Sequence, residues 1–107
     1  MGYNYVHNFR GVTTEDVESE VYEINQTINN AGAGSIIALL ESTGTTDGIL
    51  EFWGGNSDDN LIKIEEYAID AATMNIPINM QFIVKFLQIK IIMNNLTEVN
   101  YKIDCFL

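Results

Sequence analysis

Residues 14–30, TEDVESEVYEINQTINN, contain the clearest periodic pattern in the sequence. The apolar residues of this stretch recur at i, i+4, i+7 and i+11 and so share one stripe of a helix: Val17, Val21, Ile24 and Ile28. Thr13 and the acidic residues after it are typical of a helix N-terminus, and Gly32 is suited to the left-handed position beyond a helix C-terminus. We therefore expect an amphipathic helix over residues 14–30.

Strands are predicted on both sides of this helix. Alternation of aromatic and polar residues predicts a first strand over residues 3–9. Residues 35–41 and 49–53 are short apolar runs separated by turn-forming residues, which predicts a hairpin. A second amphipathic helix is expected over residues 60–74, because Leu61, Ile64, Ala68 and Ala72 share one helical face.

Residues 81–93 fit a strand or a helix, and we favour a strand because β-branched residues are frequent there. Residues 98–106 alternate between apolar and polar residues and predict a last strand. The expected order is β-α-β-β-α-β-β. The predicted fold is a two-layer α+β sandwich, with two helices on one face of a mainly antiparallel sheet of about five strands and a ferredoxin-like order.

The composition points to one folded acidic domain. The chain has 107 residues, of which 47% are hydrophobic, so residues 1–107 can form a domain with its own core. Fifteen acidic residues oppose five Lys and Arg, and the net charge of −10 argues against binding nucleic acid phosphates or anionic membranes. No signal peptide or transmembrane segment is recognisable, and the single cysteine fits a reducing compartment. We expect a cytoplasmic protein.

Side chains that carry catalysis or bind metals are scarce. His7 is the only histidine, so a multi-histidine metal site cannot form, and we expect this residue to be structural. Cys105 is expected to be a buried, inert thiol. Glycines at positions 32 and 34 follow a predicted helix and precede a strand, which is the reverse of the order in a phosphate-binding loop. We predict no enzymatic activity, no cofactor and no metal site.

The negative charge is unevenly distributed along the chain. Residues 13–24 carry −5 and residues 41–70 carry −7, whereas the other segments are neutral or carry +1. One interpretation is a solvated face that keeps the protein soluble; the other is a recognition surface in which aromatic anchors stand in an acidic rim. Trp53 fits either the core or such a surface. On the second interpretation the partner-binding residues are Glu15, Glu18, Tyr22, Glu23, Asp47, Glu51, Trp53, Asp58, Asp59, Glu66 and Tyr67.

These features favour a protein-binding function. A small acidic domain without catalytic groups is typical of an immunity protein or antitoxin that neutralises a basic toxin domain, such as a nuclease, and this is our first hypothesis. The second is a phage-encoded DNA mimic that inhibits a host nucleic-acid-binding or defence protein, which requires acids over one continuous face. The third is a small ligand-binding domain or enzyme, which requires a deep pocket with a few convergent polar groups.

Overall fold

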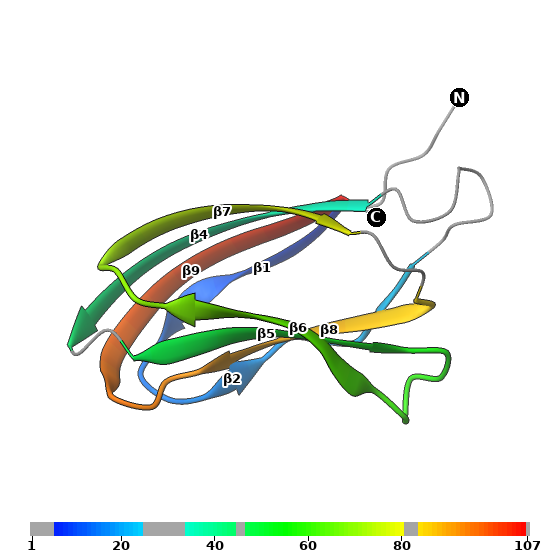
Figure 1. Ribbon diagram of the computed structural model, residues 1–107, viewed down its shortest axis with the longest axis horizontal. Coiled ribbons are helices and arrows are strands. Elements are labelled where there is room, and N and C mark those ends of the chain that lie inside the picture. Colours follow the sequence, from blue (N-terminus) through cyan, green and yellow to red (C-terminus); the bar gives the residue numbers. More distant parts are fainter. Residues whose placement is uncertain (1–5, 25–33, 45–46, 81–83, 107) are drawn as a thin grey trace.

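The computed structural model describes residues 6–24, 34–44, 47–80 and 84–106, and within these ranges the chain forms nine strands and no helix. The strands are β1 (Val6–Thr13), β2 (Val17–Glu18), β3 (Tyr22–Glu23), β4 (Gly34–Gly44), β5 (Gly48–Gly55), β6 (Ile62–Ile69), β7 (Thr73–Met80), β8 (Phe86–Ile92) and β9 (Leu96–Phe106). They lie in two layers (Figure 1). The predicted α+β sandwich with two helices and a ferredoxin-like order is therefore wrong. Accordingly, no helix in the described ranges is long and apolar enough to span a membrane.

All strand pairs that the structure describes are antiparallel. Sheet A has the order β1-β9-β4-β7, and sheet B has the order β2-β8-β5-β6 with β3 also paired to β8. Most consecutive strands lie in different sheets, so the chain crosses repeatedly from one layer to the other, as between β4 and β5 (Figure 1). This connectivity is that of a jelly roll, which combines two antiparallel sheets through Greek-key connections.

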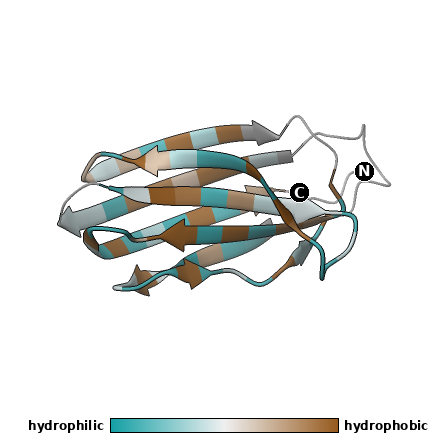
Figure 2. Cartoon of the chain, turned by 60° about the horizontal axis from the view of Figure 1, so that its bottom comes forward, coloured by the Kyte–Doolittle hydropathy of each residue, from teal (hydrophilic) through white to brown (hydrophobic). Residues whose placement is uncertain are grey.

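The core lies between the two sheets. Successive side chains of a strand point to opposite faces, so every second residue is buried, as the alternating hydropathy along the strands shows (Figure 2). Sheet B contributes Leu50 and Phe52 from β5 and Leu87 from β8, each at most 2% exposed. Sheet A contributes Leu40 and Ile103. The residues that alternate with these buried ones along each strand form the outer face of each sheet.

An irregular edge of sheet B stands where a helix over residues 14–30 is predicted. Val17 pairs with Ile91, and continuing that register would place residue 86 opposite Tyr22. Tyr22 instead pairs with Leu87, so the chain between β2 and β3 contains one extra residue. The insertion breaks the period of two and produces spacings that resemble those of a helix. Residues 25–30 of the predicted helix lie outside the described residues.

A β-bulge explains the second wrong helix, predicted over residues 60–74. Phe52 pairs with Glu65 but Trp53 pairs with Lys63, so Ile64 is an extra residue in β6. Ile64 and Tyr67 therefore both pack toward the core although they are three positions apart in the sequence. That spacing is typical of a helix. Ala68 and Ala72, which share the apolar face of the predicted helix with Ile64, are exposed in the structure.

The remaining strands agree with the sequence more closely. Strands over residues 35–41, 49–53, 81–93 and 98–106 are confirmed as β4, β5, β8 and β9, although residues 81–83 lie outside the described residues. The predicted hairpin is wrong, because β4 belongs to sheet A and β5 to sheet B. The strand predicted over residues 3–9 is found as β1, with residues 1–5 outside the described residues.

Ser19 supplies hydrogen bonds to β8 in the gap between β2 and β3. Its backbone N–H donates to the carbonyl of Ile89 at 2.8 Å, and its Oγ accepts from the N–H of Ile89 at 2.9 Å. The hydroxyl also donates to the carbonyl of Glu20 at 2.7 Å. Ser19 is only 5% exposed, so its side chain replaces a backbone acceptor where water has little access.

Replacing Ser19 by alanine should therefore lower the free energy of unfolding by about 1–3 kcal/mol, because the buried N–H of Ile89 loses its acceptor. Urea denaturation of Ser19→Ala measures this loss. The matched control is Ser57→Ala in the exposed β5–β6 loop, which should change stability by no more than about 0.5 kcal/mol. Equal stability of the two variants would contradict this role of Ser19.

Candidate binding surface

A row of charged residues crosses the outer face of sheet B from edge to edge. The register places Glu18 of β2 opposite Lys90 of β8, Lys90 opposite Glu51 of β5, and Glu51 opposite Glu66 of β6. Lys90 Nζ lies 3.8 Å from Glu18 Oε2. Alternation with the core residues of these strands aims the whole row at solvent.

Trp53 lies beside this row, two residues after Glu51 on the same face of β5. Its indole N–H donates to Glu51 Oε1 at 3.0 Å, and Lys90 Nζ lies 4.1 Å from the centre of its ring. The tryptophan is half-buried. A hydrogen bond and a cation–π contact thus fix the ring on a solvent-facing surface.

Lys63 owes its place on this face to the bulge in β6. The extra residue Ile64 shifts the alternation, so Lys63 pairs with Trp53 and turns outward. Its ammonium lies 2.7 Å from Glu66 Oε1 and 3.6 Å from Glu51 Oε2, which relieves the repulsion between two carboxylates that face each other. The hydrogen bond to Glu66 raises the pKa of Lys63, and the charges of both carboxylates add to this effect.

Six side chains thus form one connected cluster over four strands, which we call the Trp53 network. Its members are Glu18, Lys90, Trp53, Glu51, Lys63 and Glu66. Four of them are predicted partner-binding residues. The two lysines were missed; the alternation in residues 81–93 could have placed Lys90 on the outer face, whereas Lys63 depends on a bulge that no residue pattern marks.

The other predicted partner-binding residues lie elsewhere. Glu15 and Asp47 are exposed at the end of the sandwich where β8 turns into β9, and Asp47 accepts a hydrogen bond from Asn95 at 2.7 Å. Asp58 and Asp59 are exposed in the β5–β6 loop at the opposite end. Glu23 is exposed on the edge strand β3. The single acidic helix face that the sequence predicts is absent, since the helix is absent.

Two of the predicted aromatic anchors belong to the interior. Tyr22 is 8% exposed, and its ring stacks on His7 with 4.4 Å between the ring centres. Tyr67 packs against the core and meets Phe52 edge-to-face at 6.1 Å. Burial raises the pKa of both tyrosines. Tyr22 is thus buried and Tyr67 partly buried, with its ring against the core.

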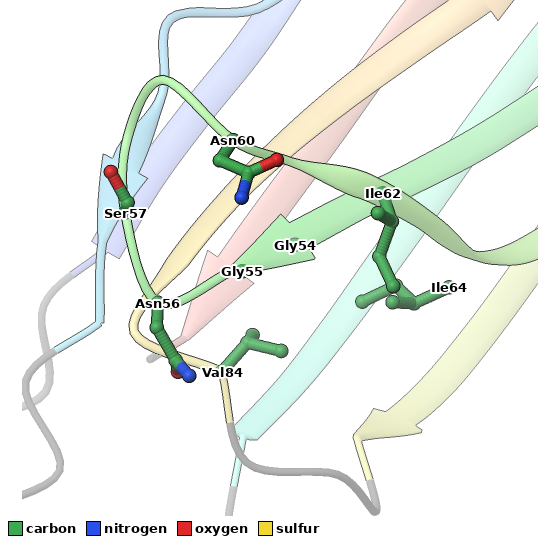
Figure 3. A pocket seen from close by; sticks show the side chains of 8 residues that line it. All are labelled: Gly54, Gly55, Asn56, Ser57, Asn60, Ile62, Ile64 and Val84. Carbon is green, nitrogen blue, oxygen red and sulfur yellow. The ribbon is translucent and has the colours of Figure 1, made fainter.

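A small open cavity of about 370 Å³ lies at the end of sheet B, under the β5–β6 loop (Figure 3). Its wall combines amide and hydroxyl groups from the loop with aliphatic side chains: Gly54, Gly55, Asn56, Ser57, Asn60, Ile62, Ile64 and Val84. None of these residues is a histidine, lysine or carboxylate, so they supply no acid or base to a reaction. Across the described residues, no three His, Cys, Asp or Glu side chains gather in a way that could hold a metal ion.

Comparison with known proteins identifies the fold only. No protein-family model matches the chain, and no curated protein is similar to it in sequence. The crystal structure of Yersinia pseudotuberculosis-derived mitogen is similar, with a TM-score of 0.54, 17% identity, and coverage of 98% of this chain and 87% of that chain. At such low identity the similarity supports the two-sheet architecture and carries no information on partner or activity.

His7 gives a prediction on the pH dependence of stability. Its Nε2 is buried without a hydrogen-bond partner in the described structure, and burial lowers its pKa below the ordinary 6.5, although the charge of Glu20 opposes this shift. The native state therefore binds fewer protons than the unfolded state below about pH 6.5, and stability falls as the pH decreases through that range. His7→Phe, which keeps an aromatic ring beside Tyr22, should lose less stability than the wild type between about pH 7 and pH 5. Parallel denaturation curves at each pH measure this; equal losses would contradict it.

Cys105 should be unreactive in the native protein. The thiol is fully buried, and this burial, with a contribution from the charge of Asp104, raises its pKa to about 12. At pH 8 iodoacetamide should therefore leave native protein unmodified but alkylate it after unfolding in urea, as mass spectrometry would show. Rapid alkylation of the folded chain would contradict the burial of this thiol.

Proposed function

We propose that this protein is a binding domain without catalytic activity that recognises a positively charged partner protein through the outer face of sheet B. The observation that carries the proposal is Trp53, an aromatic ring held on a solvent-facing sheet by Lys90 and Glu51. Tryptophan is over-represented in binding hot spots. A ring that is already fixed also loses little conformational freedom when a partner packs on it.

Charge around Trp53 supports a basic partner. In the described part of the chain, the outer face of sheet B carries Glu18, Glu51 and Glu66 in the Trp53 network and exposed Glu23 at its edge, together with Lys63 and Lys90. Exposed carboxylates at the rim of an interface accelerate the encounter with a cationic partner, and salt screens this effect. We therefore infer that the carboxylates increase the association rate of the partner and that Trp53 decreases its dissociation rate.

Of the two binding hypotheses, this charge pattern favours protein recognition over DNA mimicry. A DNA mimic requires an uninterrupted acidic face, but Lys63 and Lys90 interrupt the outer face of sheet B, and Arg10 and Lys102 interrupt that of sheet A. The narrower hypothesis, an immunity protein or antitoxin against a basic nuclease toxin, stays a prediction, because neither the fold nor the comparisons bear on it. The cytoplasmic location stays a prediction for the same reason.

The test compares capture of basic proteins from a cell extract by the immobilised wild type and by Trp53→Ala. A protein retained by the wild type should bind Trp53→Ala roughly 30-fold more weakly, as expected for a hot-spot tryptophan, and should dissociate faster. The matched control is Ile62→Ala, which truncates a hydrophobic residue that is 64% exposed and outside the Trp53 network. It should bind like the wild type.

A second arm separates the role of charge from that of the ring. Reversing Glu18 and Glu23 to lysine should slow association at low ionic strength and leave dissociation nearly unchanged, in surface plasmon resonance with the captured protein. Raising the salt concentration should bring wild-type and variant association rates together. If Trp53→Ala and the charge-reversed variant both bind as the wild type does, the outer face of sheet B is not the recognition surface.

A further inference from the structure

The outer face of sheet A, on the opposite side of the sandwich from the Trp53 network, holds most of the exposed large hydrophobic residues in the described part of the chain. Five large hydrophobic residues of the described chain are exposed, and four of them lie on this face: Val12, Ile37, Leu39 and Phe106, at 60%, 43%, 42% and 37% exposure. The fifth, Ile62, lies on β6 of sheet B. Scattered exposed apolar residues are ordinary, but their concentration on one face is characteristic of an interface.

The strand register brings the central members of this group together. Ile37 of β4 lies opposite Pro77 of β7, which is also exposed, and Leu39 follows two residues later on the same face. On the other side of β4, Phe106 of β9 lies opposite Ser35, diagonal to Ile37. The apolar patch therefore lies along β4 and reaches Pro77 on the edge strand β7 and Phe106 at the end of β9, while Asp104 and Lys102 of β9 lie opposite Ile37 and Leu39 and border it.

Charge distinguishes this face from the rest of the molecule. It carries Arg10, Lys102, Asp104, Glu41 and Glu98, a net charge of −1. The other twelve carboxylates and three lysines lie elsewhere and carry −9. Arg10 and Asp104 neutralise each other through a bidentate contact, with Nη2 to Oδ2 at 2.8 Å.

We infer that two copies of this chain associate through the outer faces of their A sheets to form a twofold symmetric dimer. Copies that carry −10 each repel one another in most orientations, and the outer face of sheet A is the surface where this repulsion is weakest and apolar area is available. A basic partner, in contrast, is drawn to the other surfaces. An isologous dimer of this kind is the commonest form of protein oligomer.

The size of the face fits this occupant. Sheet A has four strands, which lie about 4.8 Å apart in a sheet, and its two central strands, β4 and β9, have eleven residues each, at about 3.3 Å per residue. A face of this size is of the same order as the roughly 800 Å² that each partner buries in a standard interface. The dimer leaves the Trp53 network of both copies on the outside, so this inference does not rest on the proposed function.

Analytical ultracentrifugation of the purified full chain, over a wide range of concentrations, tests the inference. The wild type should sediment as a dimer that dissociates on dilution. Leu39→Asp should weaken the dimer roughly 100-fold or more. Twofold symmetry places the substituted residue of both copies in the interface, so two unpaired carboxylates would be buried there. The matched control Ile62→Asp introduces the same group at an exposed site on the other sheet and should dimerise like the wild type. Circular dichroism verifies that both variants are folded.

Salt provides an independent readout. Because the two copies carry like charge, the wild-type dimer should become tighter as ionic strength rises, whereas binding of a basic partner should become weaker. Lys102→Glu should weaken the dimer at low salt and recover at high salt, while Lys85→Glu, away from this face, should have a smaller effect. A wild type that is monomeric at every concentration and salt would overturn the inference, as would equal dimerisation of Leu39→Asp and Ile62→Asp. A monomeric wild type whose Leu39→Asp variant loses a different bound protein would assign the face to that protein instead.

Discussion

The register of β5 against its two neighbours is the constraint on which the core and the candidate site both depend. Leu50 and Phe52 of β5 are buried, while Glu51 and Trp53, which alternate with them, lie on the outer face. A slip of one residue would exchange these sets and bury a carboxylate between the sheets. The free energy gained by burying apolar side chains therefore specifies, at the same time, which side chains are presented outside.

Single-residue irregularities shape what this register leaves exposed. The extra residue Ile64 in β6 turns Lys63 outward, where it bridges the facing carboxylates of Glu51 and Glu66. The inserted residue between β2 and β3 leaves a gap in the edge of sheet B that Ser19 closes with its hydroxyl. Both irregularities lie at sheet edges, where added twist and an unpaired residue are tolerated, as is common for bulges.

The two outer faces differ in chemistry although they share one architecture. The outer face of sheet B holds the Trp53 network, in which carboxylates outnumber lysines around a fixed aromatic ring. The outer face of sheet A holds Ile37 and Leu39 on a central strand with almost balanced charge. A jelly-roll sandwich keeps such surfaces apart because the core separates them, so the proposed dimer contact and the proposed partner-binding face do not overlap.

Local pattern alone determined several strands of this protein and part of its site. Alternation in β5 and β9 is a property of any half-buried pleated strand, so it predicts both elements and places Glu51 and Trp53 on one face. The net charge of −10 and the scarcity of catalytic side chains likewise follow from the sequence. The sheet to which each strand belongs was decided by tertiary structure, since β4 and β5 pack across the core instead of forming a hairpin. Tertiary structure also determined the insertion before Tyr22 and the bulge at Ile64, because partner strands determine where an extra residue is accommodated. Each of these extra residues changes the two-residue period of a strand into spacings that resemble those of a helix.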